Sequence, residues 1–342
     1  MKRYNLKEFQ LSQAYLFYWD KLEKANYFLE QILDTTDEDL EGRLVQRLLK
    51  VPAQDGGQWD MVANLVEKYG LVPQPLYPDS FKAMDSAVMR TLITTKLHED
   101  AFELRRLVSE SSNPRSSLSS VKEKMVREIH LILTLVLGPP PNPNKNMIWE
   151  YYDNDDKFCS VSTSPLSLAG ELSGKSSNQA NTGFDYRELF SIVNDPRNSY
   201  GSHLSVNRLG NIIDMRPCRY VNVDIVTMKT ACIGMLKSDL PVFFGCDSGK
   251  FIDKASGIYD TGLIDYELGF NVRLEMSKAQ RLLTGESMMT HAMVFTAVHV
   301  IEGKPLRWRV ENSGGEEKGP TGWFVLSDRW MDEFVYQAVV DP

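Results

Sequence analysis

One short run of residues sets the strongest limit on how this chain can fold: Gly138-Pro139-Pro140-Pro141-Asn142-Pro143. Proline lacks a backbone N–H and its ring clashes with the preceding helical turn, so no helix continues through this run. Before it, apolar residues recur at helix-like intervals, whereas the sequence after it is richer in strand-like segments. The sequence therefore predicts an α+β fold with a helical first part and a β-rich second part.

The helical part contains a second boundary at Tyr77-Pro78. Ser12 is a suitable N-cap for a first long helix, and shorter helical patterns follow at residues 43–50 and 59–69. Beyond the boundary come two long helical patterns separated by Ser111-Ser112-Asn113-Pro114, which predict an antiparallel helical arm. We therefore expect three domains: a helical part at 1–78, the arm at 79–138 and a β-rich part at 139–342.

The clearest strand signals lie in the last quarter of the sequence. Residues 291–301 and 306–311 are strand-like and flank the short turn Glu302-Gly303-Lys304, which predicts an antiparallel hairpin. A third strand is expected at residues 322–326. The region 162–183 is rich in Ser, Gly and Asn and predicts a loop.

The composition is that of an ordinary soluble globular protein, with 42% hydrophobic and 25% charged residues. The net charge of -8 argues against whole-surface attraction to nucleic acid or anionic lipid, although it leaves room for a local basic stripe. Four cysteines in 342 residues are too few for a disulfide scaffold and favour a reducing compartment. We expect a cytoplasmic protein, or a mitochondrial form of one, with no signal peptide, membrane span, metal or cofactor.

Of the five histidines, His291 has the context that best fits catalysis, because it opens a predicted strand. The partner strand ends at Glu311-Asn312, and an antiparallel hairpin brings residues near its two open ends together. An amide oxygen beside a His ring fixes its tautomer without adding a full negative charge, which a thiolate–imidazolium pair requires. The alternative is an ordinary polar pair at a strand end. The remaining histidines are expected to be structural or exposed: His98, His130, His203 and His299.

Blocks of sequence along the chain carry a resemblance to a known family. They are Leu11–Lys21, Gly42–Gln46, Asp55–Met61, Val193–Arg197, Phe244–Asp247, Gly285–Ser287, Thr290–Met293, Trp308–Glu316, Gly322-Trp323 and Ser327–Trp330. In this order they resemble the bleomycin hydrolase family of papain-like cysteine peptidases. The resemblance covers nearly the whole chain and is weakest at residues 162–183. It implies a papain-like α+β fold, with a helical left domain that carries an inserted hook and a β-rich right domain.

The resemblance also implies roles for individual residues. His291 would be the general base and acid, and Asn312 would orient its ring. Gly56-Gly57 would present backbone to a bound peptide, where close approach leaves no room for a side chain; a plain helix-entry turn is the alternative. The arm at 79–138 matches the family's hook, which helps build a hexameric ring around an inner cavity. Peptide substrates and a homo-oligomer are therefore implied.

The chain departs from the family pattern at the nucleophile. The family carries its oxyanion Gln and its catalytic Cys in a segment that opens the central helix, and we find no counterpart before Ser12. Without that helix, the apolar stripe of Tyr15, Trp19 and Leu22 is expected to be exposed, and the chain marginally stable. The cysteines that are present lack a helix N-terminus and a nearby His, so each is expected to be inert: Cys159, Cys218, Cys232 and Cys246.

Two further departures affect the site. Gly314 stands where the family has a Trp after Asn-Ser, and loss of that indole would leave the His–Asn hydrogen bond more exposed to water. The family's chain also continues into a tail that enters the cleft and gives aminopeptidase behaviour. We find no counterpart of that tail after Asp341-Pro342.

Three functions are compatible with these features. The first is an intracellular cysteine-type aminopeptidase that hydrolyses peptide or amide bonds by a Cys-His-Asn mechanism, seen here without its nucleophile. The second is a catalytically inactive paralogue that acts as an oligomeric interaction or nucleic-acid-associated protein. The third is a hydrolase that uses Ser287 with His291, although their spacing is not that of a hydrolase elbow.

Overall fold

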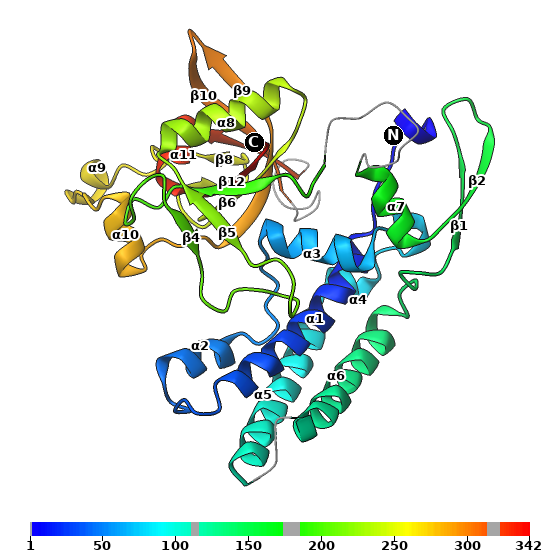
Figure 1. The fold of residues 1–342 in the computed structure, drawn as a ribbon. Coiled ribbons are helices and arrows are strands. Elements are labelled where there is room, and N and C mark those ends of the chain that lie inside the picture. Colours follow the sequence, from blue (N-terminus) through cyan, green and yellow to red (C-terminus); the bar gives the residue numbers. More distant parts are fainter. Residues whose placement is uncertain (1, 111–115, 174–184, 313–321) are drawn as a thin grey trace. The chain divides into compact units, whose positions relative to one another are not determined.

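The computed structural model describes residues 2–110, 116–173, 185–312 and 322–342 (Figure 1). The chain divides into two compact units, one of residues 1–186 with 207–217 and one of residues 187–206 with 218–342. The boundary that the sequence predicted at residue 139 falls inside the first unit. A hairpin and a short helix that follow the proline run belong with the helices rather than with the main sheet.

The first unit is mainly helical. Its elements are η1 (Lys2–Tyr4), α1 (Gln13–Asp34), α2 (Arg43–Lys50), α3 (Trp59–Tyr69), η2 (Gln74–Leu76), α4 (Phe81–Met84), α5 (Ala87–Glu110), α6 (Ser116–Leu137), β1 (Met147–Tyr152), β2 (Phe158–Thr163) and α7 (Pro165–Leu172). Ser12 caps α1 as predicted, because its Oγ accepts from the Tyr15 N–H at 3.1 Å. The predicted loop at 162–183 contains α7, and residues 174–184 lie outside the described part of the chain.

The long helices α5 and α6, predicted as an arm, pack against α1 over one apolar core (Figure 1). Buried residues from all three helices meet there, among them Leu29, Ile93 and Ile129. The prediction of an exposed Tyr15/Trp19/Leu22 stripe is wrong: Tyr15 and Leu22 are buried and Trp19 is half-buried. Leu22 belongs to this same core, and α3 covers the other two, with Tyr69 stacked on Trp19 at 4.0 Å between ring centroids.

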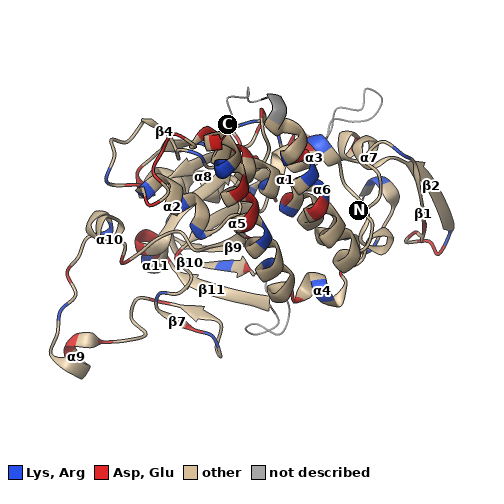
Figure 2. Ribbon diagram, turned by 90° about the horizontal axis from the view of Figure 1, so that it is seen from below, with Lys and Arg blue, Asp and Glu red and all other residues tan. Residues whose placement is uncertain are grey.

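Charges of both signs lie side by side along α1, α5 and α6 (Figure 2). Some form ion pairs between helices: Lys122 of α6 lies 2.5 Å from Glu30 of α1, and Lys96 of α5 lies 2.8 Å from Glu128 of α6. Such partly exposed pairs each stabilise the fold by about 1 kcal/mol at most. The mixture gives these three helices no basic stripe of the kind that a nucleic-acid partner requires.

Gly70 makes a close contact that only glycine allows. It ends α3 with φ of 77° and ψ of -158°, a backbone conformation that is strongly unfavourable for any residue with a Cβ. A Cβ there would lie 2.1 Å from the carbonyl carbon of Pro165, and the next residue, Leu71, donates its N–H to the Pro165 carbonyl at 3.0 Å. The close approach joins α3 to the start of α7.

Replacing this glycine is expected to be strongly destabilising. Gly70→Ala combines the strained backbone with a clash against rigid backbone atoms, so we expect a loss of about 3 kcal/mol or more in the free energy of unfolding. Chemical denaturation followed by circular dichroism measures it. Gly170→Ala, inside α7 with open space around the added methyl, is the control and is expected to be neutral or slightly stabilising.

The second unit is built on a large sheet. Its elements are β3 (Phe190–Val193), β4 (His203–Ser205), β5 (Arg219–Asn222), α8 (Ile225–Lys237), β6 (Val242–Cys246), β7 (Ile252–Asp253), β8 (Ile258–Tyr259), α9 (Tyr266–Phe270), α10 (Lys278–Thr284), β9 (His291–Ile301), β10 (Lys304–Glu311), β11 (Trp323–Ser327), α11 (Asp328–Phe334) and β12 (Val335–Val340). Within the described residues the strand order is β4-β5-β3-β12-β6-β9-β10-β11-β8-β7.

The predicted hairpin is present as β9 and β10. Its two turn residues, Glu302 and Gly303, have φ of 49° and 79°, the left-handed values that a two-residue turn needs to match strand twist. Lys304 pairs with Ile301 directly after the turn. At its other end the ladder brings the start of β9 and the end of β10 together, which is where the sequence placed the candidate site.

Aromatic residues fill the core beneath this hairpin. Phe295 of β9 stacks on Phe244 of β6 with ring centroids 3.7 Å apart, and Trp308 of β10 packs against Phe295 at 5.1 Å. Trp308 is fully buried, and its indole N–H donates to the Asp328 carboxylate at 3.0 Å. These contacts fix the hairpin on the sheet.

Candidate active site

A histidine and an asparagine meet at the open end of the β9–β10 hairpin. His291 is the first residue of β9, half-buried, and pairs across the sheet with Cys246 of β6. Asn312 directly follows β10, and its backbone N–H donates to the Gly322 carbonyl at 3.0 Å. The predicted pairing is present: His291 Nε2 lies 2.8 Å from Asn312 Oδ1.

The chemistry of the two atoms sets the histidine tautomer. An amide oxygen can only accept, so Nε2 must carry the proton that it donates to Asn312. In the neutral ring Nδ1 is then unprotonated and available as a base. A base oriented by a third group is the arrangement that activates a nucleophile.

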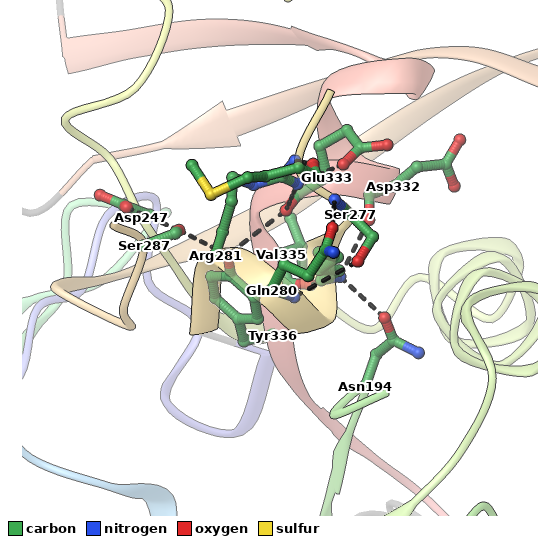
Figure 3. A network of polar contacts seen from close by, with 12 residues as sticks. Asn194, Asp247, Ser277, Gln280, Arg281, Ser287, Asp332, Glu333, Val335 and Tyr336 are labelled. Carbon is green, nitrogen blue, oxygen red and sulfur yellow. Dashed lines mark hydrogen bonds and ion pairs between the residues drawn. The ribbon is translucent and has the colours of Figure 1, made fainter. Parts of the chain in front are cut away.

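The chain that leads into His291 is held by a buried polar cluster (Figure 3). Ser287 donates to Asp247 Oδ2 at 2.8 Å and lies 2.5 Å from the Tyr336 hydroxyl. The Thr290 N–H donates to the Cys246 carbonyl at 2.9 Å, one residue before His291. Ser287 is itself buried and bound to these partners, so it is not aligned as a nucleophile for His291.

A lysine lies in the same network of polar contacts. Lys278, the first residue of α10, donates to Asn194 Oδ1 at 2.7 Å and to the carbonyls of Asp332 and Val335 at 2.9 and 2.7 Å. Burial lowers the pKa of Lys278 to about 7, against the opposing effect of Glu333. The amino group of Lys278 therefore links α10 to β12. Burying its charged form costs folding free energy, and this cost depends on pH.

The sign of this dependence follows from proton binding. The unfolded chain, with a lysine pKa of about 10.4, binds more protons than the folded chain between pH of about 7 and about 10, so stability rises with pH there. We expect the thermal midpoint of the wild type, relative to Lys278→Met, to rise over this window. Lys304→Met, at the exposed hairpin turn, is the control. If the difference in thermal midpoint between the wild type and Lys278→Met does not change from pH 7 to 10, the lowered pKa of Lys278 is contradicted.

The four cysteines of the chain do not provide an activated thiol. Burial raises the pKa of Cys232 to about 12, and it also raises the pKa of Cys246. Cys246 is fully buried although it pairs with His291 across the sheet. Cys218 is buried, and Cys159 lies within β2, with its Sγ 3.6 Å from the Lys157 carbonyl oxygen, and not at a helix N-terminus.

The predicted peptide-binding glycines lie shortly before α3. Gly56-Gly57 belongs to the first unit, exposed in the segment before α3, with open space where a Cβ would be. Gly314 lies outside the described residues. Among the residues that the structure describes, no group of three or more His, Cys, Asp or Glu side chains is placed to hold a metal ion. In the same part of the chain no helix has the length and apolar character needed to cross a membrane.

Sequence reasoning missed the residues that support these sites. Asp247 is the last residue of a recognised block but carries no motif of its own, and its role depends on Ser287, far along the chain. Lys21 and Lys24 look like ordinary solvated charges of a helix, yet both are buried against the loop that carries Gly56. In the sequence, the only hint is that Lys21 and Lys24 stand among the apolar residues of α1.

Comparison with known proteins places this geometry in a family. The sequence profile of the peptidase C1-like family matches residues 1–342. The chain belongs to the peptidase C1-like family. It is 42% identical over 342 residues to "Cysteine proteinase 1, mitochondrial" of Saccharomyces cerevisiae (strain ATCC 204508 / S288c), a match that covers 98% of this chain and 68% of that protein.

Bacterial members agree with this placement. "Aminopeptidase C" of Listeria monocytogenes is 40% identical over 337 residues, covering 98% of this chain and 73% of its own length. The crystal structure of PepW from Lactobacillus rhamnosis HN001 superposes with a TM-score of 0.92 at 40% identity, covering 99% of this chain and 74% of PepW. These matches confirm the predicted resemblance to the bleomycin hydrolase type of cysteine peptidase and the predicted papain-like α+β fold.

Proposed function

We propose that this member of the peptidase C1-like family acts as a cysteine-type aminopeptidase that hydrolyses peptide or amide bonds. The single observation that carries the proposal is the His291–Asn312 hydrogen bond at 2.8 Å, which leaves Nδ1 of the ring as the free base. Family membership supports the reaction class. His291 is the proposed acid–base residue, and Asn312 the residue that orients it.

The proposed reaction follows from this orientation. A cysteine thiol gives its proton to Nδ1 of His291, and the thiolate attacks the scissile carbonyl carbon. The imidazolium then protonates the leaving amine, so that a thioester forms and the C–N bond breaks. A water molecule, deprotonated by the same ring nitrogen, hydrolyses the thioester and restores the thiol. Asn312 keeps the ring in one orientation during both proton transfers.

In this scheme the thiol is none of the four cysteines of residues 1–342, because Cys218, Cys232 and Cys246 are buried and Cys159 is not at a helix N-terminus that would activate it. In the proposal it comes from a segment like the one that opens the central helix of papain-like peptidases. Gly57 pairs through its backbone with an extended peptide substrate. The hook helices α5 and α6 take part in a homohexamer. The proposed location is the cytoplasm or a mitochondrion, the compartment that the name of the yeast relative gives.

One observation favours a second candidate, a catalytically inactive paralogue. Cys218, Cys232 and Cys246 are buried, and Cys159 lies on β2 rather than at a helix N-terminus that would activate its thiol. Such a paralogue would keep the hook and assemble, and bind a protein partner or, less favoured given the mixed charges of its long helices, nucleic acid.

Restoring the nucleophile decides between the two. A segment with the Gln…Cys-Trp sequence that the resemblance implies for the family is joined to residue 1, and hydrolysis of leucine 4-methylcoumaryl-7-amide is followed by fluorescence. We expect activity that iodoacetamide blocks. The same fusion with its segment's cysteine replaced by serine is the control. A folded fusion that is no faster than this control overturns the peptidase proposal and leaves the paralogue.

A further inference from the structure

The loop that carries Gly56-Gly57 is anchored to α1 by two buried lysines. Lys21 Nζ donates to the carbonyls of Ala53 and Gln54 at 3.1 and 3.0 Å and to the Asp55 carboxylate at 2.5 Å. An ammonium group has three protons to donate, so these three acceptors saturate it. Only 1% of the Lys21 side chain is exposed. The loop is thus bound through its backbone rather than through packing alone.

Lys24, one turn further along α1, reaches the part of the loop nearest the glycines. Its Nζ donates to Gln54 O at 2.9 Å, to Gly56 O at 2.8 Å and to the carboxylate of Asp20 at 2.7 Å. These acceptors saturate the second ammonium group as well. The Lys24 side chain is 5% exposed, so each bond forms away from competing water.

The bond to Gly56 O sets the direction of the next N–H. In a trans peptide the C=O of one residue and the N–H of the following residue point in opposite directions. Because the Gly56 carbonyl points at Lys24 on α1, the Gly57 N–H must point away from the helix. Gly57 is exposed, and within the described residues neither its N–H nor its carbonyl has a hydrogen-bond partner.

Charges around the loop hold the same arrangement. Burial opposes ionisation of Asp55, but Lys21 and Arg90 outweigh it and hold the pKa of its carboxyl below the usual value. Arg90, which belongs to α5, forms an ion pair with this carboxylate. Asp55, in the loop between α2 and α3, is therefore bound by one cation from α1 and one from α5.

We propose that Lys24, supported by Lys21, is a positioning residue that fixes the Gly57 peptide plane so that its N–H faces an incoming extended peptide. The inference rests on the proposed function, in which Gly57 pairs with substrate backbone. A loop without regular hydrogen bonding would otherwise lose entropy when it orders around a peptide. The two lysines supply that order in advance.

The test measures peptide binding in the 342-residue chain and needs no catalysis. The chain is labelled with 15N-glycine and titrated with acetyl-Ala-Ala-Ala-amide while the Gly57 amide resonance is followed by NMR. We expect the peptide to shift this resonance in the wild type. In Lys24→Met we expect about tenfold weaker binding and a lower heteronuclear NOE at Gly57. Lys122→Met, which removes a different lysine bound to α1, is the control and should match the wild type.

Several outcomes overturn the inference. One is a wild-type Gly57 resonance that the peptide does not shift; another is Lys24→Met binding the peptide as well as Lys122→Met does. If Lys24→Met is unfolded by circular dichroism, Lys24→Gln replaces it, because its terminal nitrogen is one atom closer to the backbone and falls short of Gly56. Since no bond is cleaved, these outcomes are independent of whether the cysteine fusion is active.

Discussion

His291→Ala is expected to abolish peptide hydrolysis in the protein that carries the added cysteine segment. Without the ring the thiol loses its base and the leaving amine its acid, so kcat/KM should fall by about 10²- to 10⁴-fold. Asn312→Ala should give a smaller loss, about tenfold to hundredfold, because the ring remains but its tautomer and orientation are no longer fixed. The fluorogenic leucine amide measures both variants.

His299→Ala is the matched control for this experiment. His299 lies on the same strand as His291 but near the turn, exposed, where its ring nitrogen accepts from Arg307 at 3.2 Å. We expect the activity of His299→Ala to stay within about twofold of the wild type, a change of under about 0.5 kcal/mol in the activation free energy. Equal losses in His291→Ala and His299→Ala would mean that the hairpin matters only for folding.

Trp308→Ala is expected to be among the most destabilising single changes in the second unit. The variant removes a fully buried indole from the stack on Phe295 and leaves the Asp328 carboxylate without its donor. Large-to-small aromatic changes of this kind lower the free energy of unfolding by about 3–5 kcal/mol. Because β10 leads directly to Asn312, the His–Asn pair should also become mobile. Urea denaturation monitored by fluorescence gives the loss.

Trp323→Ala provides the comparison for Trp308. Trp323 is half-buried at the start of β11, with the Arg309 guanidinium 3.9 Å above its ring. Its removal opens a smaller cavity and, among the residues that the structure describes, breaks no buried hydrogen bond, so we expect a loss of about 1–2 kcal/mol. Similar losses for the two tryptophans would contradict the view that the β9–β10 core is what fixes the site.

The sequence predicted some elements well because local rules decide them. The hairpin at His291–Ile301 is specified by its strand-like residues and by a turn whose two residues adopt positive φ. The capped α1 and the long helices α5 and α6 follow from their spacing. The exposed stripe around Tyr15 was a wrong prediction, since an apolar helix face does not say which neighbour covers it. Here Leu65 and Tyr69 of α3, which is distant from Tyr15 in the sequence, pack in the same apolar cluster as Tyr15.

The candidate site was also predictable only in part. The His291–Asn312 pairing follows from hairpin geometry once the turn is known, and the family resemblance points to the same two residues. The hydrogen bonds from Lys21 and Lys24 to loop carbonyls were not predictable. Every residue has a backbone carbonyl, so the sequence does not show which carbonyl a lysine will bind. In the sequence of α1 alone, the two lysines look like ordinary exposed residues. Only the position of the loop in the fold shows that they are buried.

The orientation of the His291 ring tests the central claim most directly. In 15N-histidine-labelled chain, at a pH where the ring is neutral, two-bond 15N–1H correlation spectra identify which nitrogen carries the proton. We expect Nε2 to be protonated and bonded to Asn312 while Nδ1 carries no proton, and we expect Asn312→Ala to give a mixture of tautomers. A proton on Nδ1 with Nε2 bare, or a spectrum that Asn312→Ala leaves unchanged, would contradict the claim that this chain holds a base ready for a thiol.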